Sequence, residues 1–337
     1  MILATKAAIA HSSAVDVYDV AIAYGTANNV TAYLFQAGYG TKYADPATLP
    51  TGAGYSVDFT SDRATLAVAH NTSPAISVYP WSSGFGTKYT DPATLPAGNG
   101  RSVAFSNDDS TIAVGSTTNP NIAVYPWSAG FGTKYADPSI AVPNDGQGVT
   151  FSSDDSTIAV AHSATPYVSV YPWSAGFGTK YSDPATIPTS TAYQAVFTSD
   201  DSTIAVAHQV SPYIAVYPWS SGFGTKYSDP ATLPAGNALG VAFSPDDQNI
   251  VIAHQTTPYT SAYPWSAGFG TKYADAATLL SGNGNAVAFT TSGNDIAYAH
   301  LTTPYTSAYP WSAGFGTKYA DPASPPSGTG IGIAFTP

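Results

Sequence analysis

The chain has 337 residues and a formal net charge of −11, and only 9% of its residues are charged, against roughly a quarter in an average soluble protein. It contains no cysteine and no glutamate, which excludes a disulfide framework and a thiolate metal site and disfavours a helix-rich fold. The acidic balance argues against a nucleic-acid partner, and without a run of about 20 apolar residues no membrane insertion is expected.

The first twelve residues precede the regular pattern of the chain. They are too weakly apolar for a secretory signal and lack its charged start, so we predict no signal peptide and a soluble protein. Within them, Ala7–Ser12 is predicted to form an extra strand or a short arm.

The rest of the chain is a repeat. The string Gly-Phe-Gly-Thr-Lys-Tyr, with Tyr in place of Phe once, occurs seven times at a constant spacing of 46 residues. Its lysines are Lys42, Lys88, Lys134, Lys180, Lys226, Lys272 and Lys318. Seven periods without an insertion or deletion predict seven equivalent units in a single domain over residues 1–337.

The first period contains three apolar runs, at Val20–Tyr24, Val30–Phe35 and Gly40–Tyr43. A complete period, such as the one that starts at residue 102, contains four such runs, rich in β-branched and aromatic residues and separated by turn residues. In that period Pro126 is expected to end the third strand, because proline has no N–H for a ladder. Four strands in a period of this length are typical of a propeller blade.

The last period has only a first strand. Ile333–Thr336 is in register with Val57–Thr60 and is followed by a single residue. We therefore predict that residues 331–337 complete the blade begun by the first period, which closes a ring and removes free sheet edges. A solenoid would need polar end caps, and none is visible. The predicted fold is all-β, a seven-bladed β-propeller of 46-residue, four-stranded blades.

The run Val241–Asp247, followed by Ile250–Ile252 and an aromatic third strand, resembles the WD40-like and YVTN-type propellers over nearly the whole chain. The resemblance implies that the second-to-third and fourth-to-first loops share one face. The chain departs from WD40 repeats, because Tyr125-Pro126 stands where those have Trp-Asp, so an adaptor role is not implied. The near-identical blades also resemble propellers encoded by tailed bacteriophages, which implies a virion protein.

One candidate site is an arc of histidines and tyrosines on the face shared by those loops. Histidine recurs at the end of the second strand, and four of the blades also carry tyrosine five residues later. The candidate binding residues are His162, Tyr167, His208, Tyr213, His254, Tyr259, His300 and Tyr305. Tyrosine is favoured at interfaces, so the arc predicts a surface for one asymmetric partner. Alternatively, each histidine caps its own blade through a local hydrogen bond.

A second candidate is the tryptophan that precedes each Gly-aromatic-Gly turn, a position where stacking on sugars is conceivable. These residues are Trp81, Trp127, Trp173, Trp219, Trp265 and Trp311. Alternatively, their rings cover the outer strands and wedge adjacent blades together. Paired aspartates such as Asp108-Asp109 could hold calcium, but they occupy turn positions where the side chain bonds its own backbone.

No catalytic motif is present, and no catalytic residue, metal site or cofactor is predicted. The preferred hypothesis is a non-enzymatic structural or attachment propeller, most concretely a bacteriophage virion protein (fibre, spike or decoration). Its expected partners are other proteins of the assembly or a host surface component. The alternatives are a multivalent glycan-binding propeller and a lactonase-like hydrolase. Lactonase-type propellers use acidic metal ligands that include glutamate, which this chain lacks.

Overall fold

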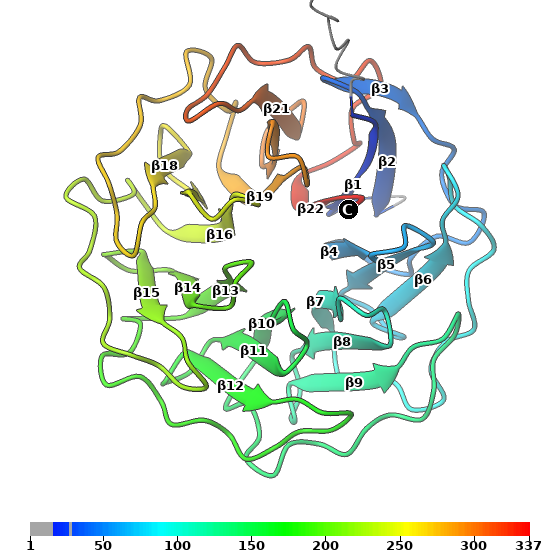
Figure 1. Ribbon diagram of the computed structural model, residues 1–337. Coiled ribbons are helices and arrows are strands. Elements are labelled where there is room, and N and C mark those ends of the chain that lie inside the picture. Colours follow the sequence, from blue (N-terminus) through cyan, green and yellow to red (C-terminus); the bar gives the residue numbers. More distant parts are fainter. Residues whose placement is uncertain (1–15, 27–28) are drawn as a thin grey trace, which may run out of the picture.

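The computed structural model describes residues 16–26 and 29–337, and the arm predicted over residues 1–12 lies outside this part of the chain. The described residues form 22 strands in seven sheets arranged around a central axis (Figure 1). No helix in this part of the chain is long and apolar enough to cross a membrane. The prediction of an all-β, seven-bladed propeller is confirmed.

Each sheet begins with an inner strand at the central axis and continues outward through antiparallel neighbours. The inner strands are β4 (Gly54–Phe59), β7 (Gly100–Phe105), β10 (Gly146–Phe151), β13 (Ala192–Phe197), β16 (Ala238–Phe243), β19 (Gly284–Phe289) and β22 (Gly330–Phe335). The middle strands are β1 (Tyr18–Tyr24), β5 (Thr65–His70), β8 (Thr111–Ser116), β11 (Thr157–His162), β14 (Thr203–His208), β17 (Asn249–His254) and β20 (Asp295–His300). The third strands are β2 (Val30–Phe35), β6 (Ile76–Pro80), β9 (Ile122–Pro126), β12 (Val168–Pro172), β15 (Ile214–Pro218), β18 (Thr260–Pro264) and β21 (Thr306–Pro310).

The fourth strand of the blade is regular in only one sheet, where β3 (Tyr39–Lys42) pairs with β2. In the other six blades the fourth segment makes an isolated bridge, such as Trp81 with Phe85, and a few further backbone bonds. In the blade of β6, the N–H of Gly86 donates to the carbonyl of Pro80 at 2.8 Å. Proline at the end of the third strand supplies a carbonyl but no N–H, so the outer pairing is sparse.

The ring closes as predicted. Strand β22, from the C-terminal end, pairs antiparallel with β1, and Ile333 lies opposite Ile22 in this register. The sheet therefore reads β22-β1-β2-β3, which combines the two ends of the chain in one blade (Figure 1). The edge that β1 would otherwise present to solvent is covered.

Seven apolar clusters hold the ring together, and each lies between two adjacent blades. The cluster between the blades of β5 and β8 contains Ala67 and Ile76 from one blade and Val103, Ile112 and Trp127 from the next. The tyrosine of each Gly-x-Gly-Thr-Lys-Tyr string adds to it, since the ring of Tyr89 meets the ring of Trp127 edge-on at 5.2 Å. Blades are thus joined by their apolar faces, and large side chains alternate with alanine at the contact.

Candidate functional site

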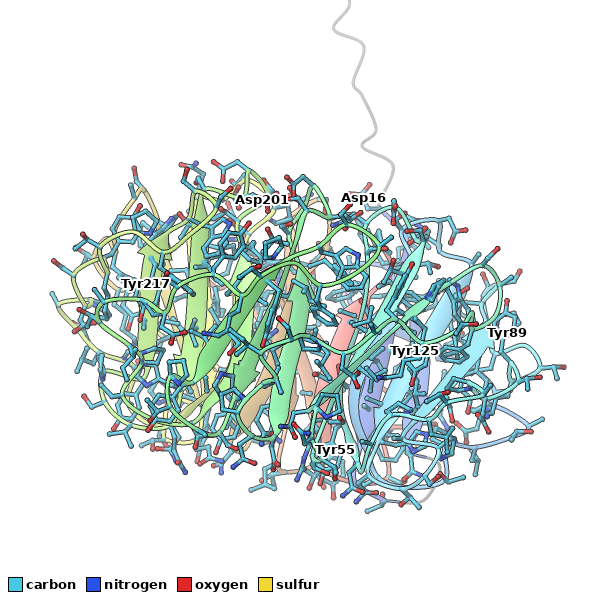
Figure 2. All side chains as sticks on the ribbon, turned by 90° about the horizontal axis from the view of Figure 1, so that it is seen from below. Asp16, Tyr55, Tyr89, Tyr125, Asp201 and Tyr217 are labelled. Carbon is cyan, nitrogen blue, oxygen red and sulfur yellow. The ribbon has the colours of Figure 1, made fainter. Side chains whose placement is uncertain are left out.

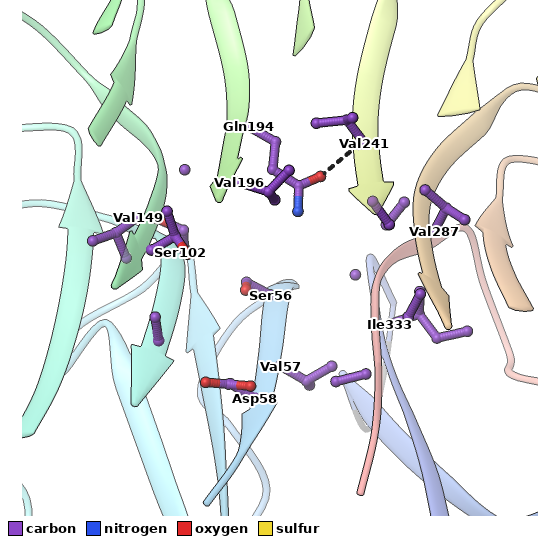
Figure 3. A pocket seen from close by; sticks show the side chains of 18 of the residues that line it. Ser56, Val57, Asp58, Ser102, Val149, Gln194, Val196, Val241, Val287 and Ile333 are labelled. Atoms are coloured by element: carbon purple, nitrogen blue, oxygen red, sulfur yellow. Dashed lines mark hydrogen bonds between the residues drawn. The ribbon is translucent and has the colours of Figure 1, made fainter. Parts of the chain in front are cut away.

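A channel of about 1060 Å³ runs through the centre of the ring. Its wall is made by the seven inner strands, which run side by side around the axis (Figure 3). Mid-depth positions are mostly small and apolar, such as Val149, Val241 and Ile333. A cavity of this size accommodates a small organic molecule.

The two ends of the channel open on two different faces. Tyr55, near the start of β4, and Asp201, in the loop after β13, lie at opposite faces of the molecule (Figure 2). The face of Tyr55 carries the second-to-third and fourth-to-first loops, which contact each other: the N–H of Asn71 donates to the carbonyl of Ala53 at 3.1 Å. The predicted sorting of these loops onto one face agrees with this contact.

One position of the repeat forms a ring of seven side chains at this end, which we call the channel mouth. The mouth consists of Tyr55, Arg101, Gln147, Tyr193, Leu239, Asn285 and Ile331. All seven are partly exposed, and they differ from blade to blade although the surrounding repeat is nearly uniform. Binding of a small asymmetric molecule in one orientation requires such differences, because a seven-fold symmetric surface offers it no distinct orientation.

Arg101 is the basic residue among the described residues that line the channel. Its guanidinium carbon lies 4.6 Å from the ring centroid of Tyr55, which is a cation–π contact. Its Nε is buried and has no hydrogen-bond partner among the described residues. A buried charged donor without an acceptor is costly, so this arrangement favours an anionic or carbonyl ligand.

Asp58 lies halfway down the channel wall on β4 and is half-buried. The equivalent positions of the other six inner strands hold no acid; they are Ala104, Thr150, Val196, Ala242, Ala288 and Ala334. The carboxylate accepts a hydrogen bond from the backbone N–H of Phe105 at 2.7 Å. The pKa of Asp58 is nevertheless raised to about 7. Burial is the main cause, the carboxylate of Asp109 adds to it, and the backbone donors oppose it.

Two polar side chains in the channel wall have hydrogens to donate, Ser56 on the same strand as Asp58 and Gln194 three blades away on β13. The Oγ of Ser56 accepts from the N–H of Val103 at 3.3 Å, which leaves its own hydrogen free. The Oε1 of Gln194 accepts from the N–H of Val241 at 2.9 Å, and its amide nitrogen points into the open channel (Figure 3). The channel therefore combines one carboxylate of near-neutral pKa with several donors, a set suited to proton transfer and to stabilising a developing oxyanion.

The structure places the predicted histidine arc below the surface. The five histidines that follow the second strands are fully buried; they are His70, His162, His208, His254 and His300. In four blades Nε2 lies within 3.0–3.1 Å of a serine hydroxyl on the third strand of the same blade. In the fifth, Ala215 replaces the serine, and the Nε2 of His208 has no partner among the described residues. The histidines therefore brace their own blades.

The four tyrosines of the arc, Tyr167, Tyr213, Tyr259 and Tyr305, are partly exposed at the corners of the second-to-third loops. Their backbone φ values are 68–72°, in the left-handed region that bulky residues rarely adopt. Each carbonyl accepts from the N–H of the buried histidine, as between His208 and Tyr213 at 2.9 Å. Binding by the arc remains a prediction.

The six tryptophans are only 4–6% exposed. Each ring packs between the phenylalanine of the following turn and the tyrosine of the neighbouring blade, as with Phe131, Tyr89 and Trp127. This is the wedging alternative raised by the sequence, and it leaves little ring surface for stacking on a sugar. Glycan stacking at these residues remains a prediction.

The paired aspartates divide into two structural roles. In the pair Asp108-Asp109, the first carboxylate accepts from the N–H of Ser110 at 2.9 Å within its own turn. The second accepts from the N–H of Ser61 in the preceding blade at 2.7 Å. In the described part of the chain, no three His, Asp or Glu side chains are grouped so as to hold a metal ion. These residues do not provide an acidic metal site of the kind expected in lactonase-type propellers.

Comparison with known proteins shows the fold. No protein-family model and no curated protein sequence match the chain. Among solved structures, a periplasmic gluconolactonase from Pseudomonas aeruginosa superposes with a TM-score of 0.71 at 15% identity, over 96% of this chain and 99% of that one. A Bacteroides fragilis protein provisionally assigned as a 6-phosphogluconolactonase gives 0.76 at 10% identity, over 98% and 100%. A protein from Lactobacillus plantarum gives 0.72 at 14% identity, over 95% and 99%.

These structures correct two predictions made from the sequence. The chain was expected to be a non-enzymatic attachment or virion protein, and hence not an enzyme; both expectations are contradicted by the structural neighbours, which include a protein provisionally assigned as a 6-phosphogluconolactonase and a gluconolactonase. The bacteriophage resemblance drew on the repeated cassette, which the structure places at the outer rim, where it joins blades. The residues that line the channel did not contribute to the bacteriophage resemblance. Asp58 had a signal in the sequence: it is the one acid at its repeat position.

Proposed function

We propose that the protein is a hydrolase of lactones, with the reaction in the central channel and Asp58 as the general base. The observation that carries the proposal is the position and pKa of Asp58: it is the one carboxylate on the described inner strands, it lines the channel, and burial raises its pKa to about 7. A base of this pKa is half ionised at neutral pH, where general-base catalysis is efficient. The lactonases of the same fold support the choice of reaction.

In this mechanism ionised Asp58 accepts a proton from a water molecule as the water oxygen bonds to the lactone carbonyl carbon. The carbonyl electrons move to the oxygen, and the resulting oxyanion accepts a hydrogen bond from the Ser56 hydroxyl, while the Gln194 amide on the other side of the channel donates to another oxygen of the substrate. The ring C–O bond then breaks, and the departing alkoxide takes the proton back from Asp58. The product is a hydroxy acid, which releases its carboxyl proton to solvent.

The roles of the donors follow from their other bonds. Ser56 and Gln194 are each held by a backbone N–H of the next blade, so their free hydrogens have a fixed direction. Donors whose orientation is set before the reaction stabilise charge more effectively than water, which must reorient. Arg101 at the mouth would hold an anionic group of the substrate, such as the phosphate of 6-phosphogluconolactone.

The test is proton release in a pH-stat with glucono-δ-lactone, 6-phosphogluconolactone and simple γ- and δ-lactones. We expect hydrolysis above the uncatalysed rate for at least one of these lactones, with kcat/KM rising with pH to a plateau above about pH 7. Asp58→Asn should lower kcat/KM at least about 100-fold. Asp145→Asn is the matched control, because the carboxylate of Asp145 makes no hydrogen bond or ion pair with the described residues. Full activity in Asp58→Asn, or no turnover of any lactone, would contradict the proposal.

A further inference from the structure

We infer that the channel takes an amphipathic ligand, with an anionic or carbonyl group at one end and an aliphatic chain at the other. That such a ligand is also the substrate rests on the proposed function. That the channel binds it rests on the division of the channel mouth into a polar and an apolar side.

The polar side comes from four consecutive blades. Tyr55, Arg101, Gln147 and Tyr193 stand on β4, β7, β10 and β13, which are neighbours around the ring (Figure 1). Arg101 contributes a buried Nε without an acceptor, and the adjacent Gln147 and Tyr193 make no side-chain hydrogen bond with the described residues. These groups have unused hydrogen-bonding capacity, and a ligand with charged or carbonyl oxygens would satisfy the donors.

The apolar side comes from the remaining three blades. Leu239 on β16 and Ile331 on β22 face the channel, together with Leu301 from the β20–β21 loop. Leu301 is 45% exposed, so part of its side chain is available to a ligand in the channel. Two polar side chains here already make side-chain hydrogen bonds: the Asn285 amide donates to the carbonyl of Gly330 at 2.7 Å, and the Gln255 carbonyl oxygen accepts from Asn237 at 3.1 Å.

The charge pattern of the molecule directs the anionic end to Arg101. The seven repeat lysines are each paired with the aspartate three residues later, as Lys42 is with Asp45 at 2.8 Å. Arg101 has no carboxylate partner in the described part of the chain and sits beside a low-dielectric apolar wall. Its attraction for an anion is therefore not offset by a neighbouring carboxylate, whereas that of the partly buried lysines at the rim is.

The experiment is a calorimetric titration with a probe series that cannot be hydrolysed: butanoate, hexanoate, octanoate and 1-octanol. We expect one site per chain, with affinity for the carboxylates rising about two- to fourfold per methylene as the chain covers the leucine side. Arg101→Gln should weaken octanoate about tenfold and leave 1-octanol unchanged. Leu301→Asn should flatten the dependence on chain length and spare butanoate.

Matched variants control for general effects. Arg63→Gln removes an exposed arginine that does not line the channel, and Leu279→Asn removes a leucine of similar exposure (37%) outside it. Both should bind like the parent protein. Equal binding of octanoate by the Arg101→Gln variant, or affinity independent of chain length in the parent, would overturn the inference. Because the probes are not substrates, binding with no lactone turnover would refute the proposed function alone, and turnover of lactones with no such binding would refute the ligand class alone.

Discussion

Asp155 joins its blade to the preceding one through Asn107. The backbone N–H of Asn107 donates to Oδ1 of Asp155 at 2.7 Å, and the N–H of Asp108 donates to Oδ2 at 2.9 Å. Asp155 stands at φ 57°, a left-handed turn position that aspartate tolerates. The same bridge recurs from Asp109 to Ser61, from Asp201 to Ser153 and from Asp247 to Ser199. The second aspartate of each pair is thus an inter-blade clamp.

Asp155→Asn should lower the free energy of unfolding by about 1 kcal/mol. The substitution removes the charge and places an amide N–H₂ against one of the two donors, but the bridge lies at the surface, where such bonds contribute modestly. Urea unfolding followed by tryptophan fluorescence measures the change. Asp145→Asn should leave the midpoint unchanged, and an equal loss in both variants would show that the bridge is not the cause.

The contact between the blades of β16 and β19 lacks this clamp on both sides. Pro245 stands where the four clamped contacts have an N–H donor, and Gly293, at φ 72°, stands where they have the accepting aspartate. A Cβ added at Gly293 would meet Pro245 Cδ at 3.4 Å, which is ordinary contact. The double variant Pro245→Ser, Gly293→Asp should therefore be more stable than the two single variants predict, by about 1 kcal/mol. Strict additivity of the three unfolding free energies would count against this reading.

Asp58→Asn should stabilise the fold at alkaline pH while abolishing hydrolysis. The pKa of Asp58 lies near 7 in the fold and near 3.9 in the unfolded chain. The unfolded chain therefore loses this proton first, and the contribution of Asp58 to stability is lost as pH rises through the folded pKa. Because the side chain is only half-buried, we expect a gain of about 1–2 kcal/mol at pH 8 and little change at pH 4. An asparagine variant less stable than the parent at pH 8 would contradict this.

Acid should destabilise the protein through its five buried histidines. Burial lowers the pKa of each to about 4, whereas an unfolded histidine takes a proton near pH 6.5. Between these values the unfolded state binds more protons, so stability falls with falling pH, by up to about 1.4 kcal/mol per pH unit for each histidine. Urea midpoints at pH 7.5, 6.0 and 5.0 measure the slope.

A single variant identifies the histidines as the source of that slope. His254→Gln keeps a donor near Ser261, which lies 3.1 Å from His254 Nε2, but removes the titrating ring. The histidine contribution to the slope should then fall by about one fifth, since one of five equivalent groups is gone, while Asp58 contributes the same slope of opposite sign in both proteins. An unchanged slope would assign the acid sensitivity to other groups.

Removal of residues 330–337 should open the ring. Without β22, the N–H and C=O groups of β1 that pair with Ile333 and Ala334 have no partner, and the aromatic contact between Phe35 and Phe335, at 5.0 Å between ring centroids, is lost. An unpaired edge invites pairing with another chain. We expect a lower melting temperature and self-association in analytical ultracentrifugation. A truncated protein that stays monomeric with an unchanged melting temperature would contradict the role of β22.

The sequence by itself determined the architecture. The constant spacing of 46 residues, the turn residues between short apolar runs and the lone first strand at Ile333–Thr336 were sufficient for blade count and ring closure, because each is a local or periodic property. A regular fourth strand was predicted in every blade, but in six blades this segment makes only an isolated bridge. Its short aromatic run resembles a strand in sequence, although the neighbouring strand ends in proline and offers few groups for pairing.

The site was decided by the tertiary structure. The sequence analysis followed the residues that repeat, and His162 and Trp127 proved to be buried braces within and between blades. Asp58 and Arg101 matter because their repeat positions differ from blade to blade, and only the closed ring shows that these positions line one channel. The pKa of Asp58 depends on burial by neighbours far away in sequence, which no local pattern encodes.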